Sequence, residues 1–172
     1  MRITPPTLAI ASLLLMVSSV GHSQRLSRPI NPRSVVLTQL GDAALVQPNG
    51  ANDAADAYET ALAIDPQNRA ALIGLARASM KQELPGKAIR YYREALVLLP
   101  DDTQALEGQG EAMVAKGAFA KANENLAKIK TLCVGTCPEQ IALSDAIARA
   151  TAVAPVSAAQ LTSKPLVTEG AN

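Results

Sequence analysis

Apolar side chains recur through the middle of this chain at the three- and four-residue spacing of one buried face of an α-helix. The clearest case is 69–82, where Leu72, Leu75 and Ala76 share a face. The same spacing predicts further helices over about 35–44, 52–64, 86–98 and 138–150, and two more within 103–130. In the first of these, the apolar residues that lie mostly on one face are Val35, Val36, Leu40, Ala43 and Ala44.

Proline and glycine mark the boundaries between these helices. Asp65-Pro66 ends the helix 52–64, because proline cannot continue the hydrogen-bond ladder and restricts the residue before it. Pro85 stands where the first turn of a helix tolerates proline, and Lys116-Gly117 supplies a C-terminal stop. Pro48-Asn49-Gly50 is a turn signal. We therefore expect separate helices joined by turns.

The apolar pattern also repeats along the chain with a period of 34 residues. Positions that share this step are Ala54, Ala88 and Ala122, and then Tyr58, Tyr92 and Leu126. A fixed period of this length is typical of a solenoid built from stacked helix pairs. Aromatic residues are only 2% of the chain, which suits closely packed helices better than strands. The predicted fold is an all-α solenoid of about three helix-turn-helix units over 34–150.

The last predicted helix is expected to cap this solenoid. A terminal element must cover the last apolar face and present a polar face outside. The apolar residues of 138–150 that would do the covering are Ile141, Leu143, Ala146 and Ile147. On the other side of the same helix, Glu139, Gln140, Asp145 and Arg149 are expected to face water.

The two ends of the chain lack this periodicity. Residues 1–23 resemble an export signal: Arg2 is followed by the uncharged apolar run 8–20 and by Gly21-His22-Ser23, a small-x-small cleavage site. An uncleaved anchor is the alternative, but 13 residues fall short of the ~20 that span a bilayer. Residues 24–33 are predicted to be an extended leader and 151–172 a disordered tail. The expected location is periplasmic, with full secretion as the other outcome.

Charge and residue types narrow the function. Without residues 1–23 the chain has 15 basic and 15 acidic residues and no histidine. A neutral chain without a basic stripe is a poor ligand for nucleic acid, and no basic cluster remains to hold a membrane surface. A Ser–His or Cys–His nucleophile cannot be assembled without histidine, and no phosphate-binding glycine loop occurs. We expect a protein that is not an enzyme and binds no cofactor or metal.

The two cysteines of the chain, Cys133 and Cys137, are four residues apart across a turn that contains glycine. In an oxidising compartment a local structural disulfide is the favoured interpretation. A thiol-redox role is the alternative, although it prefers Cys-x-x-Cys on a βαβ scaffold. A zinc site is disfavoured, because two thiols without histidine provide half of the usual ligands.

The repeated unit resembles the tetratricopeptide repeat, a 34-residue helix-turn-helix family. The match is strongest over 69–102, and the third unit follows over 103–130. In the first unit Leu40-Gly41 fits the family if one extra residue lies in the turn 48–50. The residues that carry the resemblance in the second unit are Leu72, Leu75, Ala76, Ala88, Tyr92, Ala95 and Pro100.

The resemblance implies a right-handed superhelix whose concave face binds an extended peptide or a helix of another protein. The first helix of each unit lines that face. Its candidate binding residues are Ala70, Ile73, Arg77, Met80 and Lys81 in the second unit, and Gln104, Glu107, Glu111 and Val114 in the third. The family's peptide-carboxylate clamp uses Lys and Asn at several of these places, and here Asn is missing from all of them. The charged members also suit ordinary solvated helix faces.

Two functions of different classes follow. The first is an exported, non-catalytic adaptor that binds a peptide segment or another exported protein in its concave groove. The second is a structural subunit that self-associates through the edges of the solenoid. Apolar residues exposed in the groove favour the first, and an apolar patch on a convex or end surface favours the second.

Overall fold

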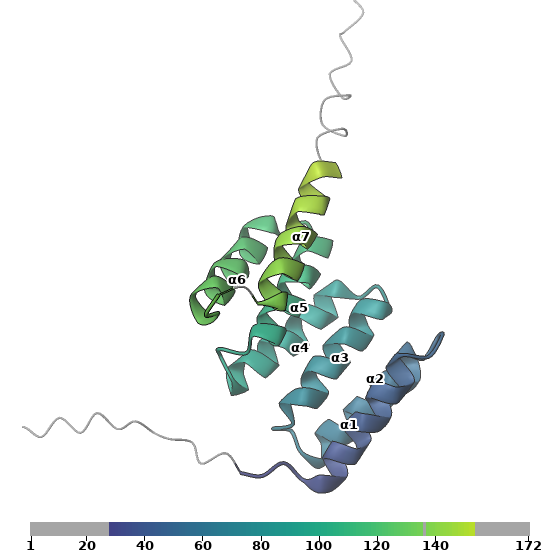
Figure 1. Ribbon diagram of the computed structural model, residues 1–172. Helices are drawn as coiled ribbons and strands as arrows, with labels where there is room; N and C mark the ends of the chain where they lie inside the picture. Colours follow the sequence, from purple (N-terminus) through teal and green to yellow (C-terminus); the bar gives the residue numbers. More distant parts are fainter. Residues whose placement is uncertain (1–27, 136, 154–172) are drawn as a thin grey trace, which may run out of the picture.

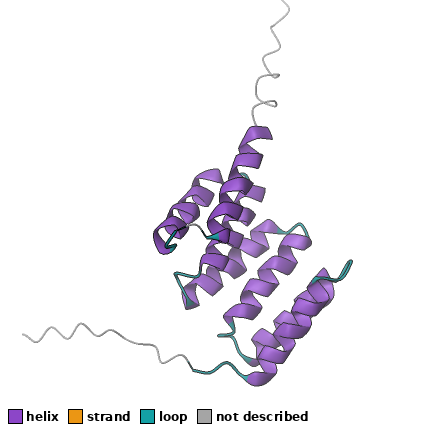
Figure 2. Cartoon of the chain, in the orientation of Figure 1, coloured by secondary structure: helices purple, strands orange, loops and turns teal. Residues whose placement is uncertain are grey.

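The computed structural model describes residues 28–135 and 137–153, and these form helices joined by short turns, with no strand among them (Figure 2). The seven helices of this part are α1 (Pro32–Leu45), α2 (Ala51–Ile64), α3 (Arg69–Lys81), α4 (Pro85–Leu98), α5 (Thr103–Ala115), α6 (Phe119–Leu132) and α7 (Pro138–Val153). The predicted signal peptide and all of the predicted tail after Val153 lie outside the described residues.

The helices pack as three successive pairs, α1 with α2, α3 with α4, and α5 with α6 (Figure 1). Each pair also packs against the next through contacts of α2 with α3 and of α4 with α5. This arrangement confirms the all-α solenoid. None of the helices in the described ranges combines the length and the apolar character that crossing a bilayer requires.

Tyrosine side chains fill the spaces that glycines leave between neighbouring helices. The buried ring of Tyr58, from α2, lies against Gly41 of α1 and Gly74 of α3. One repeat later, Tyr92 lies against Gly108 in the same way. A Cβ atom at Gly74 or Gly108 would come within 2.3 Å of a ring carbon, so the close helix approach depends on glycine.

The buried face of α1 differs from the one that its apolar residues suggest. Val36 and Leu40 are 55% and 56% exposed, whereas Ser34 and Thr38 are buried. Ser34 and Thr38 face inward because the side-chain amide of Asn68 donates to Ser34 Oγ at 2.8 Å and to Thr38 Oγ1 at 2.9 Å. The helix therefore turns these hydroxyls inward and leaves Val35, Val36 and Leu40 exposed.

Residues 28–31, part of the predicted leader, are mostly exposed but are tied to the first unit by hydrogen bonds. Asp65 accepts hydrogen bonds from the Asn31 backbone N–H at 2.9 Å and from the Arg28 guanidinium at 3.2 Å. The Asn31 N–H is the largest cause that lowers the pKa of the Asp65 carboxyl below its usual value. The Asn31 side chain caps α1, which therefore begins at Pro32.

The helix α7 closes the far end of the solenoid by packing on α5 and α6 (Figure 1). Leu143 is fully buried there, beside Gly110 of α5. Ile141, predicted to share the covering face, is instead 50% exposed. The helix also continues to Val153, three residues beyond its predicted end.

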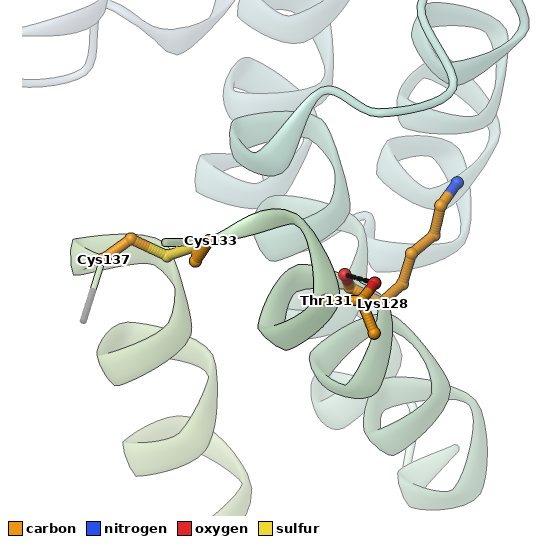
Figure 3. Close-up of a disulfide and its surroundings, with 4 residues drawn as sticks. All are labelled: Lys128, Thr131, Cys133 and Cys137. Carbon is orange, nitrogen blue, oxygen red and sulfur yellow. Dashed lines mark hydrogen bonds between the residues drawn. A yellow bond between two sulfur atoms is a disulfide. The ribbon is translucent and has the colours of Figure 1, made fainter. Parts of the chain in front are cut away.

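A disulfide joins α6 to this cap. Cys133 follows the last residue of α6 and Cys137 precedes the first residue of α7, and their sulfur atoms are bonded (Figure 3). Both cysteines pack against the core that contains Leu143. The disulfide joins the two cysteines that the sequence analysis favoured as a pair, and its place indicates that it fixes the cap to the third unit.

Candidate functional site

An open groove of about 790 Å³ lies between α1, the start of α3 and the end of α4. Its lining mixes apolar side chains with two arginines and one aspartate. The lining residues are Arg28, Ile30, Val35, Thr38, Gln39, Asp42, Gln67, Asn68, Arg69, Ala70, Leu98 and Leu99. Ala70 is the one predicted concave residue among them.

The arginines of this groove are each held by a buried aspartate. Arg69 pairs with Asp102, whose other oxygen accepts the Ala105 N–H and so caps α5. Arg28, which is 67% exposed, pairs with the fully buried carboxyl of Asp65. These contacts fix the guanidinium groups at the edge of the groove while leaving part of each in solvent.

A row of ionisable side chains continues from this groove across α3 and α5. The hydroxyl of Tyr58 donates to Asp42 Oδ1 at 2.8 Å. Burial and then Asp42 raise the pKa of Tyr58, while the charge of Arg77 lowers it. Arg77 has the same influence on Tyr92, which also senses Glu107 and Glu111 of α5. Arg77 therefore lies between the tyrosines of two successive units.

Glu107 is a strongly perturbed carboxyl group of this row. Burial raises its pKa to about 7, the carboxylates of Glu111 and Glu139 add to the increase, and Arg77 opposes it. The α5 side of the face therefore gains negative charge as the pH rises through neutrality. We use the name concave strip for Asp42, Arg77, Glu107 and Glu111.

The structure separates the predicted site residues into two groups. Arg77 and Gln104 are exposed, and Glu107, Glu111 and Val114 are half-buried, so all five have surface from which to contact a ligand. Ile73 is 4% exposed and belongs to the core. Met80 packs against the same core, and Lys81 donates to the Leu45 carbonyl at 2.9 Å, which fastens α3 to the end of α1.

The first unit also contributes to this face, which the sequence pattern did not predict. The predicted candidates came from the second and third units only, whereas Val35 and Asp42 line the groove. A signal was present, because the extra residue in the first turn shifts the repeat step to 35 residues. That step relates Leu40 to Leu75, and it also relates Val35 to Ala70 and Asp42 to Arg77.

The groove and the concave strip place partly exposed charges beside apolar side chains. Among these residues, no group of three or more His, Cys, Asp or Glu side chains is placed to hold a metal ion. Cys133 and Cys137 are bonded to each other and lie at the α6–α7 junction. A concave row of partly exposed charges beside an apolar groove suits a polypeptide ligand.

Stacked helix pairs, with glycine-tyrosine contacts of Tyr58 and Tyr92 between the first helices, define a helical repeat solenoid. The tetratricopeptide repeat model matches 38–103 and 73–124, which together span just over half of the chain. The protein belongs to the tetratricopeptide repeat family. A comparison with curated protein sequences finds no match.

Solved structures share the same fold. The Sgt2 TPR domain from Aspergillus fumigatus superposes with a TM-score of 0.63 at 25% identity, covering 72% of this chain and 80% of that chain. The first TPR of Spaghetti (RPAP3), bound to the HSP90 peptide SRMEEVD, superposes with a TM-score of 0.62 at 22% identity, covering 70% and 96%. The first TPR domain of human RPAP3 gives 0.63 at 21% identity, covering 70% and 94%.

Proposed function

We propose that this protein is a non-catalytic adaptor that binds a polypeptide segment of another protein along its concave face. The observation that carries the proposal is the position of Arg77, which is exposed at the centre of the concave strip and forms no salt bridge with any described residue. A charge held in this way is ready to pair with a ligand. Membership of the tetratricopeptide repeat family supports this function, as does the peptide bound by the first TPR of Spaghetti.

The charges of the face define the ligand more closely. The strip has one positive group, Arg77, among three acidic groups, so we expect it to prefer a segment with basic residues near α5. The apolar part of the groove, with Val35 and Leu99 exposed, would take an apolar side chain of the same segment. This pattern differs from a clamp for a peptide carboxylate.

We further propose that the adaptor works in the bacterial periplasm after removal of residues 1–23. The apolar run 8–20 and the small residues before Gln24 support this location, and an oxidising compartment suits the Cys133–Cys137 disulfide. Intact-mass measurement of the protein from its producing cells tests this part. A chain that begins at Gln24 is expected, and a chain that retains Met1 in the cytoplasm would contradict export.

Affinity purification from the same compartment tests the adaptor function. The binding variant is Arg77→Ala with Glu111→Ala, and its matched control is Lys121→Ala with Glu124→Ala, which also removes one charge of each sign from exposed positions on α6. We expect a partner to be retained by the wild type and the control and lost by the binding variant. Equal recovery with both variants would place the interface elsewhere.

A further inference from the structure

The first unit leaves an apolar surface uncovered at the start of the solenoid. A shallow groove of about 460 Å³ runs between α1 and α2 and is lined by Pro32, Arg33, Val36, Leu37, Thr60 and Ile64. Val36 and, one turn further along, Leu40 are each more than half exposed. We use the name end face for this groove together with Leu40 and Asp53.

The repeat itself shows what kind of element this surface is shaped to receive. The 35-residue step relates Val36 and Leu40 to Ala71 and Leu75, which are 0% and 1% exposed. Ala71 and Leu75 are buried because they pack in the core around Tyr58 of α2, the second helix of the preceding unit. At α1 no preceding unit exists among the described residues, so its equivalent side chains lack the helix that covers them elsewhere.

The charges on the end face have a two-fold complementary arrangement. Arg33 is the only basic residue in α1 and α2, and it lies at the start of α1. Asp53 lies at the start of α2 on the same stripe as Ala57, Thr60 and Ile64, because these residues follow one another at three- and four-residue steps. The two helices are antiparallel, so the opposite charges mark opposite ends of the face, about 16 Å apart.

We infer that the end face binds the end face of a second copy of this chain, forming a symmetric dimer. A two-fold axis through the apolar middle brings Val36 and Leu40 against their own counterparts. The same axis brings Arg33 of each copy against the partner's Asp53, so the dimer contains two such pairs. Each copy thereby supplies to the other the helical surface that a preceding unit would have supplied. The concave faces remain open, so the dimer would present two peptide sites.

Sedimentation velocity over a range of concentrations tests the dimer, with the protein purified from its producing cells. The wild type is expected to shift from monomer to dimer as concentration rises. Leu40→Glu should abolish the shift, whereas Val97→Glu, which alters another apolar residue that is more than half exposed, on α4, should leave it unchanged. A monomer at every concentration would overturn the inference and leave the end face to residues 1–27 or to another protein.

Charge reversal tests the two-fold geometry itself. Arg33→Asp and Asp53→Arg each replace two attractive pairs with two repulsive ones, so each variant alone should dimerise at least about tenfold more weakly. An equimolar mixture of the two variants restores both attractive pairs and should form a heterodimer. Circular dichroism verifies that each variant is folded. A mixture that stays monomeric beside a dimeric wild type would exclude this docking geometry.

Discussion

At the scale of single residues, the contacts that set the spacing of the helices are those between glycine and tyrosine. Tyr58 is completely buried, and its ring meets backbone at Gly41 and Gly74 rather than side chains. The ring reaches through to Asp42 on the concave side, so one side chain both spaces the helices and orients a charge of the binding face. Packing and recognition are therefore coupled at this position.

Gly74→Ala is expected to destabilise the protein even though alanine is the better helix former. The new methyl group would lie 2.3 Å from the Tyr58 ring, and overpacking of this kind costs about 1–3 kcal/mol. The gain in helix propensity, about 1 kcal/mol, offsets part of that cost. Gly86→Ala is the control, because no atom lies within 4 Å of its added methyl group. Urea unfolding should show a loss for the first variant and none for the second.

The pKa of Glu107 predicts a pH-dependent stability. Because this pKa is raised from 4.5 to about 7, the folded state binds more protons than the unfolded state between those values. The free energy of unfolding should therefore fall as the pH rises from about 4.5 to about 7 and level off above that range. Glu107→Gln removes the ionisation and should flatten this part of the profile. An unchanged slope in the variant would contradict the placement of Glu107 beside Glu111 and Glu139.

At the scale of helices, the two ends of the solenoid differ in how they are covered. The helix α7 covers α5 and α6 and is tied to α6 by the disulfide, so the C-terminal end has a cap. The N-terminal end has α1, which buries the hydroxyls of Ser34 and Thr38 and leaves Val36 and Leu40 more than half exposed. Because of this contrast, we place the proposed dimer interface at the N-terminal end.

The cap is predicted to depend on one leucine. Leu143→Ala removes a fully buried side chain from the core of the third unit and should cost about 2–5 kcal/mol in the free energy of unfolding. Ile141→Ala, two residues earlier on the same helix and half exposed, should change it by less than about 0.5 kcal/mol. Similar losses for both variants would mean that α7 packs through a different face.

At the scale of the whole molecule, the fold was predictable because it repeats. The 34-residue step placed Tyr58 with Tyr92 and Gly74 with Gly108, and the structure shows these residues in equivalent contacts. The orientation of α1 was not predictable from its own pattern, because it depends on Asn68, which lies 30 residues beyond Thr38. Likewise, nothing local to Lys81 shows that the Leu45 carbonyl is its partner.

The sequence could nominate candidate residues for the site, but it could not show which of them are buried. The family resemblance located the concave face, and charges at Arg77 and Glu111 are on its surface. The burial of Ile73 was missed, because helical spacing alone does not fix how far neighbouring helices cover a residue at the edge of a face. The raised pKa of Glu107 could not be predicted from the sequence either, because it arises from burial and from Glu139 on α7.

The central claim is that the concave face holds a polypeptide partner, and site-specific photo-crosslinking in the producing cells tests it most directly. A photoreactive residue is placed at Ala70, exposed in the groove, and in a separate variant at Val97, which is 66% exposed on α4. The account predicts a crosslinked partner from position 70, competed by excess unlabelled protein, and none from position 97. Crosslinking from position 97 alone would contradict it.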